Sequence, residues 1–139
     1  MAKIIFTLNI LCIPFLVGGC AFDLVHVEQI PTKLNLEKSC NKSFVLTKNV
    51  EIQLGGGYSR TLKKGTRWRC IGMIDQGEIY KTNDQILTIE ASNIFEAYIV
   101  ISSNKLVGFY LPVEDTFSPL GNSAELAIDE ISHVQNTNQ

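Results

Sequence analysis

From Ser43 onward, turn residues divide the chain into short apolar segments, and this spacing constrains the fold more than any other feature of the sequence. The turn-forming stretches are Gly55-Gly56-Gly57, Lys63-Lys64-Gly65, Asp75-Gln76-Gly77, Asn83-Asp84, Ser92-Asn93 and Ser102-Ser103-Asn104. Apolar segments of about four to eight residues between such signals are typical of strands, and short connections favour antiparallel neighbours. The spacing therefore predicts an all-β domain built as a small antiparallel barrel or sandwich.

The alternation inside these segments predicts which side chains face the core. Residues 43–54 alternate with a period of two and break once at Lys48, which indicates a half-buried strand with a kink. Within 66–74, Trp68 and Cys70 share one face, and the arginines on either side of Trp68 take the other. We therefore expect Trp68 in the core beside Cys70, and the two arginines in solvent.

Two consecutive segments, Ile94–Ile101 and Lys105–Leu111, are apolar on both faces. Their short connection predicts an antiparallel hairpin, and their composition predicts that it lies at the centre of the core. Pro112 ends the second segment because proline offers no amide hydrogen to a ladder. Residues 123–131 fit helical spacing and strand alternation equally well, so the sequence leaves both open there.

The chain begins with a segment that has the composition of an export signal. Lys3 supplies a positive charge, and Ile4–Val17 is an apolar run interrupted only by Thr7, Asn9 and Pro14. Such a run matches the roughly 7–15 residues of a signal-peptide core and falls below the ~18 needed to cross a bilayer. An uncleaved apolar helix is the alternative interpretation.

The stretch Leu16-Val17-Gly18-Gly19-Cys20 closes this segment and resembles the lipobox of bacterial lipoproteins. The resemblance implies that signal peptidase II removes residues 1–19 and that the Cys20 thiol carries a diacylglyceryl group, which anchors the chain to a membrane. In Gram-negative lipoproteins of this kind, Asp after the acylated cysteine favours retention in the inner membrane. Ala21 at that position therefore implies the inner leaflet of the outer membrane, with the domain facing the periplasm.

The predicted mature chain has three parts. Residues 20–39 contain Pro31 and show no sustained period, so we expect a lipidated tether with one edge strand around Leu24–Val27. Residues 40–131 are the β domain, which at about 90 residues is long enough to bury a core. Residues 132–139 form a polar tail that we expect to be disordered.

The four cysteines sort by their position in the chain. One leaves with the signal peptide and Cys20 receives lipid, so Cys40 and Cys70 remain as a pair in an exported protein. A disulfide between them is the default in an oxidising compartment. A metal site is the alternative, but two cysteines with the distant His26 and His133 make a poor set of zinc ligands. We therefore expect a disulfide, no metal and no cofactor.

Parts of the mature chain resemble bacterial SH3-like domains. Residues Leu62–Trp68 are similar to a strand entry in those domains. Residues Gly108–Leu111, followed by Phe117–Leu120, are similar to their last hairpin and short turn. The resemblance implies an SH3-like barrel, and it implies no functional residues.

Basic residues gather around the only tryptophan, and they are Arg60, Lys63, Lys64, Arg67 and Arg69. Two interpretations stay open. The residues form a patch that faces an anion or a partner, such as a phosphorylated lipid, teichoic acid or an acidic protein. Alternatively, they are the solvated face of a strand. The neighbouring glycine run, 55–57, is not followed by the Gly-Lys-Ser/Thr of a phosphate loop, so we expect a hairpin tip there.

No spacing of residues indicates catalysis. The two histidines fall outside the predicted core strands, which leaves no base beside a nucleophile. The balance of 12 basic against 14 acidic side chains argues against a nucleic-acid partner.

The leading hypothesis is an envelope lipoprotein that binds or scaffolds a protein or cell-wall component. The second is an inhibitor, immunity or exclusion-type lipoprotein, and the third is an enzyme on an envelope substrate. Acidic residues that would serve such an enzyme are Glu90, Glu96, Glu114 and Asp115.

Overall fold

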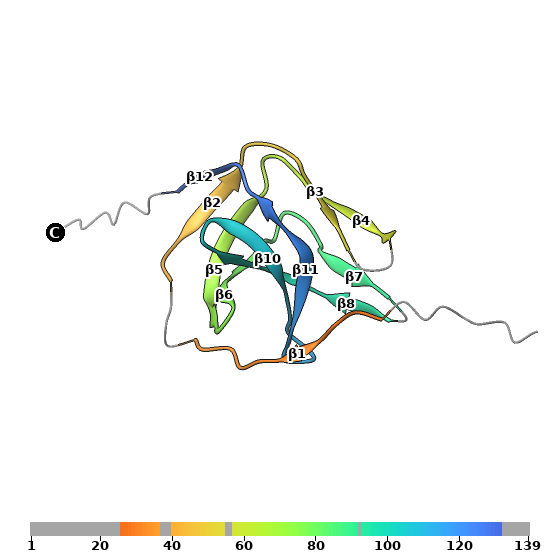
Figure 1. Ribbon diagram of the computed structural model, residues 1–139. Helices are drawn as coiled ribbons and strands as arrows, with labels where there is room; N and C mark the ends of the chain where they lie inside the picture. The colour runs from red at the N-terminus through yellow and green to blue at the C-terminus, as the bar shows by residue number, and fades with distance from the viewer. Residues whose placement is uncertain (1–25, 37–39, 55–56, 92, 132–139) are drawn as a thin grey trace, which may run out of the picture.

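A computed structural model describes residues 26–36, 40–54, 57–91 and 93–131. Within these ranges the chain forms strands and turns without an α-helix, and all the strand pairs are antiparallel. Figure 1 shows the strands wrapped around a common centre. The prediction of an all-β antiparallel fold is confirmed.

Twelve strands follow one another along the described chain. They are β1 (Ile30–Pro31), β2 (Ser43–Leu46), β3 (Val50–Gln53), β4 (Ser59–Leu62), β5 (Arg67–Ile74), β6 (Gly77–Lys81), β7 (Thr88–Glu90), β8 (Ile94–Glu96), β9 (Tyr98–Ser102), β10 (Lys105–Leu111), β11 (Thr116–Glu125) and β12 (Ile128–Glu130). Eight form one sheet in the order β1-β11-β10-β9-β6-β5-β2-β12. The hairpins β3–β4 and β7–β8 form two further sheets of two strands each.

The large sheet closes on itself. β11 leads into β12 after only Leu126 and Ala127, and β12 pairs with β2. The strands β2, β5, β6, β9, β10 and the β11–β12 segment therefore form a ring of antiparallel pairs, which is a small barrel. The register shifts between Cys70 and Gly72 in β5, and between Leu106 and Gly108 in β10. Such bulges bend and twist strands, as closure of a barrel requires.

The main core fills the inside of this barrel. Along β5 the exposure alternates, so that Trp68 and Cys70 are buried and the arginines beside them are exposed, which confirms the predicted faces. The indole N–H of Trp68 donates to the Thr66 hydroxyl at 2.9 Å. The buried polar atom of the tryptophan therefore has a partner, as buried indoles usually require.

A second apolar cluster lies on the outer face of the same sheet. Its buried members alternate along the strands with the residues of the main core, and they are Ile74, Ile79, Val100, Tyr110 and Phe117. This cluster explains why β9 and β10 read as apolar on both faces. Ile99 and Ile101 belong to the main core, whereas Val100 between them belongs to the outer cluster.

The N-terminal part of the described chain lies over this outer cluster. β1 pairs with β11, Leu34 packs on the cluster, and Asn35 forms a bridge to Met73 of β5 with an N–H to carbonyl distance of 2.9 Å. Figure 1 shows the segment running along one side of the barrel. Residues 26–36 belong to the stretch assigned to the tether, and here they contact the domain. The edge strand expected around Leu24–Val27 falls partly outside the described residues, and Ile30–Pro31 is the strand that forms.

Three segments differ in detail from the strands expected. The kink at Lys48 is a change of sheet, because β2 joins the barrel and β3 joins β4. The segment Ile94–Ile101 divides at the buried Ala97 into β8 and β9. Residues 123–131, which the sequence left open, complete β11 and form β12.

The disulfide expected from the sequence is present between Cys40 and Cys70, whose Cα atoms are 5.6 Å apart. Cys40 stands just before β2, and Cys70 lies on the inward face of β5. The bond therefore ties the start of the barrel to its core.

Candidate functional site

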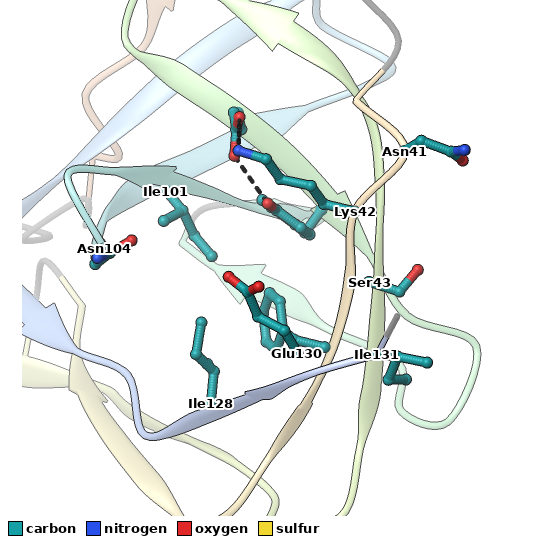
Figure 2. A pocket seen from close by; sticks show the side chains of 11 residues that line it. Asn41, Lys42, Ser43, Ile101, Asn104, Ile128, Glu130 and Ile131 are labelled. Atoms are coloured by element: carbon teal, nitrogen blue, oxygen red, sulfur yellow. Dashed lines mark hydrogen bonds and ion pairs between the residues drawn. The ribbon is translucent and has the colours of Figure 1, made fainter. Parts of the chain in front are cut away.

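A pocket of about 300 Å³ opens at the end of the barrel where β2 and β6 begin and β12 ends (Figure 2). The residues that line it are Asn41, Lys42, Ser43, Phe44, Glu78, Tyr80, Ile101, Asn104, Ile128, Glu130 and Ile131. Mouths of barrels are common sites for small ligands and inserted side chains, since the strand ends surround a hollow that the core does not fill. We call this hollow the mouth pocket.

The deep part of the mouth pocket is apolar. The rings of Phe44 and Tyr80 lie with their centroids 5.1 Å apart and their planes tilted by 54°, and both residues are buried. Ile101 and Ile128 add aliphatic surface from β9 and β12. A group that enters this pocket would therefore meet aromatic and aliphatic walls.

Charged groups stand above these walls. Lys42 Nζ lies 2.7 Å from Glu78 Oε1, and the Tyr80 hydroxyl donates to Glu78 Oε2 at 2.8 Å. Figure 2 draws both contacts, with Glu130 projecting from β12 on the other side of the pocket. The rim thus holds two carboxylates and one ammonium group, which leaves it with an excess of negative charge.

The pKa shifts of Glu78, Lys42 and Tyr80 favour fixed charge over proton exchange at neutral pH. Burial alone would raise the pKa of Glu78, but hydrogen bonds from Lys42 and Tyr80 outweigh it and lower the pKa below its usual value. The pKa of Lys42 is raised, first by its hydrogen bond to Glu78. Burial, followed by the bond to Glu78, raises the pKa of Tyr80, so its hydroxyl stays protonated and continues to donate.

The linkage of these shifts to stability has opposite signs for Glu78 and Lys42. The lowered pKa of Glu78 stabilises the fold above the pKa of the unfolded carboxyl, and this contribution is lost in acid as the folded group takes up its proton. The raised pKa of Lys42 stabilises the fold below the unfolded pKa and is lost in alkali. The ion pair is therefore intact across the neutral range. Solvent around the exposed Lys42 keeps its contribution to stability small.

The predicted basic patch is divided between ion pairs and solvent. Arg60 of β4 pairs with Glu90 of β7 and donates from Nε to the Thr88 carbonyl at 3.2 Å, which joins the two small hairpins. Arg67 Nε lies 3.4 Å from Asp84 Oδ2. Sequence separations of 17 and 30 residues divide these acids from their arginines, which is why local sequence gave no indication of the pairing.

The remaining basic residues keep their charged ends outward. Lys63 and Lys64 occupy the β4–β5 connection, where their backbone amides donate to Gln85 Oε1 at 3.2 Å and to Asn49 Oδ1 at 2.7 Å. Arg69 lies opposite Lys81 in the β5–β6 pair. Lys63, Lys64 and Arg69 are exposed. The structure therefore places the five predicted residues on β4, on β5 and in the connection between them, with two of the five paired to carboxylates.

The acidic candidates do not converge on one point of the described chain. Glu90 is paired with Arg60, Glu96 is exposed on β8, and Glu114 and Asp115 lie in the β10–β11 turn. The Tyr110 hydroxyl donates to Asp115 Oδ1 at 2.6 Å, and burial followed by this bond raises the pKa of Tyr110 to about 12.

The remaining predicted residues are placed as follows. His26 is exposed at the start of the described chain, whereas Cys20 and His133 lie outside the described residues. Among the residues that the structure describes, no group of three or more His, Cys, Asp or Glu is arranged to hold a metal ion. In the same ranges, none of the elements is a helix of the length and apolarity needed to span a membrane.

The mouth pocket was not predicted from the sequence, because its rim comes from three distant segments. Lys42 precedes β2, Glu78 lies on β6, and Glu130 lies on β12. One local signal existed. Glu78 and Tyr80 have the same parity in a short strand, which puts a carboxylate on the side of a core aromatic residue.

Comparison of the chain with protein-family models, with curated proteins and with solved structures finds no match. The resemblances to lipoproteins and to SH3-like domains therefore stay predictions.

Proposed function

We propose that this chain is an envelope lipoprotein, anchored through lipid on Cys20, whose barrel binds another envelope component through the mouth pocket. The observation that carries the proposal is the composition of that pocket: buried aromatic and aliphatic walls beneath a rim of ordered charges. A group with an apolar body and a positive or hydrogen-bond-donating end suits it, since Glu130 stands opposite the Lys42–Glu78 pair. The predicted location is the inner leaflet of the outer membrane.

The anchor is tested by Cys20→Ser. This variant should lose all labelling by a palmitate analogue and keep the mass of the precursor, because the thiol is the acceptor of the lipid. Cys12→Ser is the matched control, since it removes a cysteine of the predicted signal peptide and leaves the acceptor in place. Labelling of Cys20→Ser at the level of the unmodified chain would refute the anchor.

Binding at the mouth pocket is tested by placing a photo-crosslinking amino acid at Asn41, which lines the pocket and is exposed. Irradiation of native envelopes should give one discrete adduct, identified by mass spectrometry. Adding Glu130→Lys should reduce its yield about tenfold, because reversing a charge at a binding site repels a complementary partner. The same amino acid at Asn122, exposed on β11 and outside this pocket, is the control. Equal adducts from both positions would argue against the pocket.

A further inference from the structure

Ile86 is 90% exposed, more than the other large hydrophobic residues described, including Val113 at 79% and Ile94 at 72%. It lies between β6 and β7, in the loop 82–87. Single exposed apolar residues are common on protein surfaces and need no explanation by themselves. Ile86 differs because the loop around it is held in place and because of the charges that surround it.

Hydrogen bonds hold the loop on both sides of Ile86. Before it, the Asp84 carboxylate accepts the Arg67 backbone amide at 2.7 Å, and the Gln85 side chain donates to the Thr61 carbonyl at 3.0 Å. After it, the carbonyl of the buried Leu87 accepts the Ala97 amide at 3.1 Å. Gln85 thus occupies the edge of β4 and Leu87 occupies the core. Ile86 is left projecting into solvent from an ordered loop.

The surroundings of Ile86 are basic. Lys63 and Arg67 contact the loop through Gln85 and Asp84, and Lys81 lines the same hollow as Ile86 beside β6. Lys64 and Arg69 are exposed next to these residues in sequence or in the sheet. Near the loop, these five basic residues outnumber two carboxylates: Asp84, which pairs with Arg67, and Glu96, which lines the same hollow as Lys81. The excess of positive charge contrasts with the chain as a whole, which is acidic at −2.

We propose that this surface, Ile86 with Lys63, Lys64, Arg67 and Lys81, contacts an anionic lipid bilayer. An aliphatic side chain with lysine and arginine on the adjoining segments suits the boundary between headgroups and acyl chains, where the aliphatic group leaves water and the cations meet phosphates. The inference rests on the proposed function in one respect, because lipid on Cys20 would hold the domain close to a membrane and raise the effective concentration of this surface there. An acidic protein partner is the competing occupant.

The test uses the full lipidated chain reconstituted into vesicles with brominated acyl chains, made either of phosphatidylcholine alone or with about a quarter phosphatidylglycerol. Ile86→Trp places a reporter in the loop, and Trp68, at 1% exposure, supplies a constant background. Emission from the added tryptophan should fall by roughly half or more in the anionic vesicles. Raising salt from about 0.1 M to about 1 M should weaken this quenching, because the Debye length shortens from about 10 to about 3 Å. Val113→Trp, exposed beside Glu114 and Asp115, is the control.

Quenching that is strong at position 86, weak at 113 and dependent on anionic lipid supports the proposal. Equal quenching at the two positions, or none at 86, overturns it and leaves the acidic protein as the occupant to pursue. Flotation of the vesicles reports the anchor separately. A chain that floats without quenching at 86 keeps its lipid anchor and refutes this surface. Quenching confined to anionic vesicles, by a chain that fails to float with neutral ones, supports the surface and refutes the anchor.

Discussion

Replacing both Cys40 and Cys70 with serine is expected to lower the free energy of unfolding by about 2–4 kcal/mol. The bond closes a loop with a sequence separation of 30 residues, and an open loop of that length gives the unfolded chain many more conformations. The bond also joins the segment before β2 to the buried face of β5. Its loss therefore weakens the attachment of that segment to the barrel. Urea unfolding followed by fluorescence of Trp68 measures the change, and strand content by circular dichroism should stay the same.

Reductant provides the control for this prediction. The double variant should unfold at the same urea concentration with and without reductant, because it has no bond to lose. The chain with both cysteines should match the variant only when reduced. Two freely alkylated cysteines in unreduced, purified protein would contradict the prediction and would reopen the question of what those thiols bind.

Local sequence pattern predicted the strands whose partners are close in the chain. Alternation alone gave the inward face of β5, because Trp68 and Cys70 are separated by a polar residue that must point the other way. The β9–β10 hairpin could be predicted equally well from local sequence, since its turn and both strands lie within 98–111. In these cases the chemistry that decides the structure is contained in one short window.

β1 and β11 could not be predicted from local sequence in this way. β11 contains Pro119, Gly121 and Asn122, residues that are rare in strands, and β1 contains Pro31. Their pairing joins Ile30 to Phe117, across almost the whole domain. Such strands exist because a neighbouring strand and the outer apolar cluster stabilise them, so no local window contains the reason for their formation.

The candidate site shows the same limit. Burial of Tyr80 and the approach of Lys42 to Glu78 depend on closure of the barrel, which no spacing in the sequence records. The basic residues at 60–69 were visible as a group, whereas Asp84 and Glu90, which neutralise part of it, come from strands and loops that the fold brings alongside. Sequence therefore identified the charges, and only the fold assigns their partners.

Gly108→Ala is expected to destabilise the protein by about 3 kcal/mol, at the upper end of the cost of overpacking. Gly108 follows the bulge in β10, where the strand lies close under β11. A Cβ at this position would meet the ring of Phe117 at 2.6 Å and approach the Ser118 carbonyl even more closely. The backbone oxygen cannot move without breaking the β10–β11 pairing, and the buried ring has little space to turn. The requirement for glycine is therefore steric. It preserves the β10–β11 pairing, and β11 continues from there into β12.

Gly121→Ala is the matched control, because it makes the same substitution in β11 at a site where a Cβ would meet nothing within 4 Å. It should leave stability unchanged or raise it by about 0.4–1 kcal/mol, since alanine restricts the unfolded chain more than glycine does. Urea denaturation of the two variants side by side, with equal slopes, reports the difference as a shift in midpoint. If Gly108→Ala unfolds at the same midpoint as Gly121→Ala, β10 and β11 do not approach each other as closely at Gly108 as the structure shows. The two strands would then be farther apart in the hairpin whose second strand, β11, continues into β12 and completes the mouth pocket.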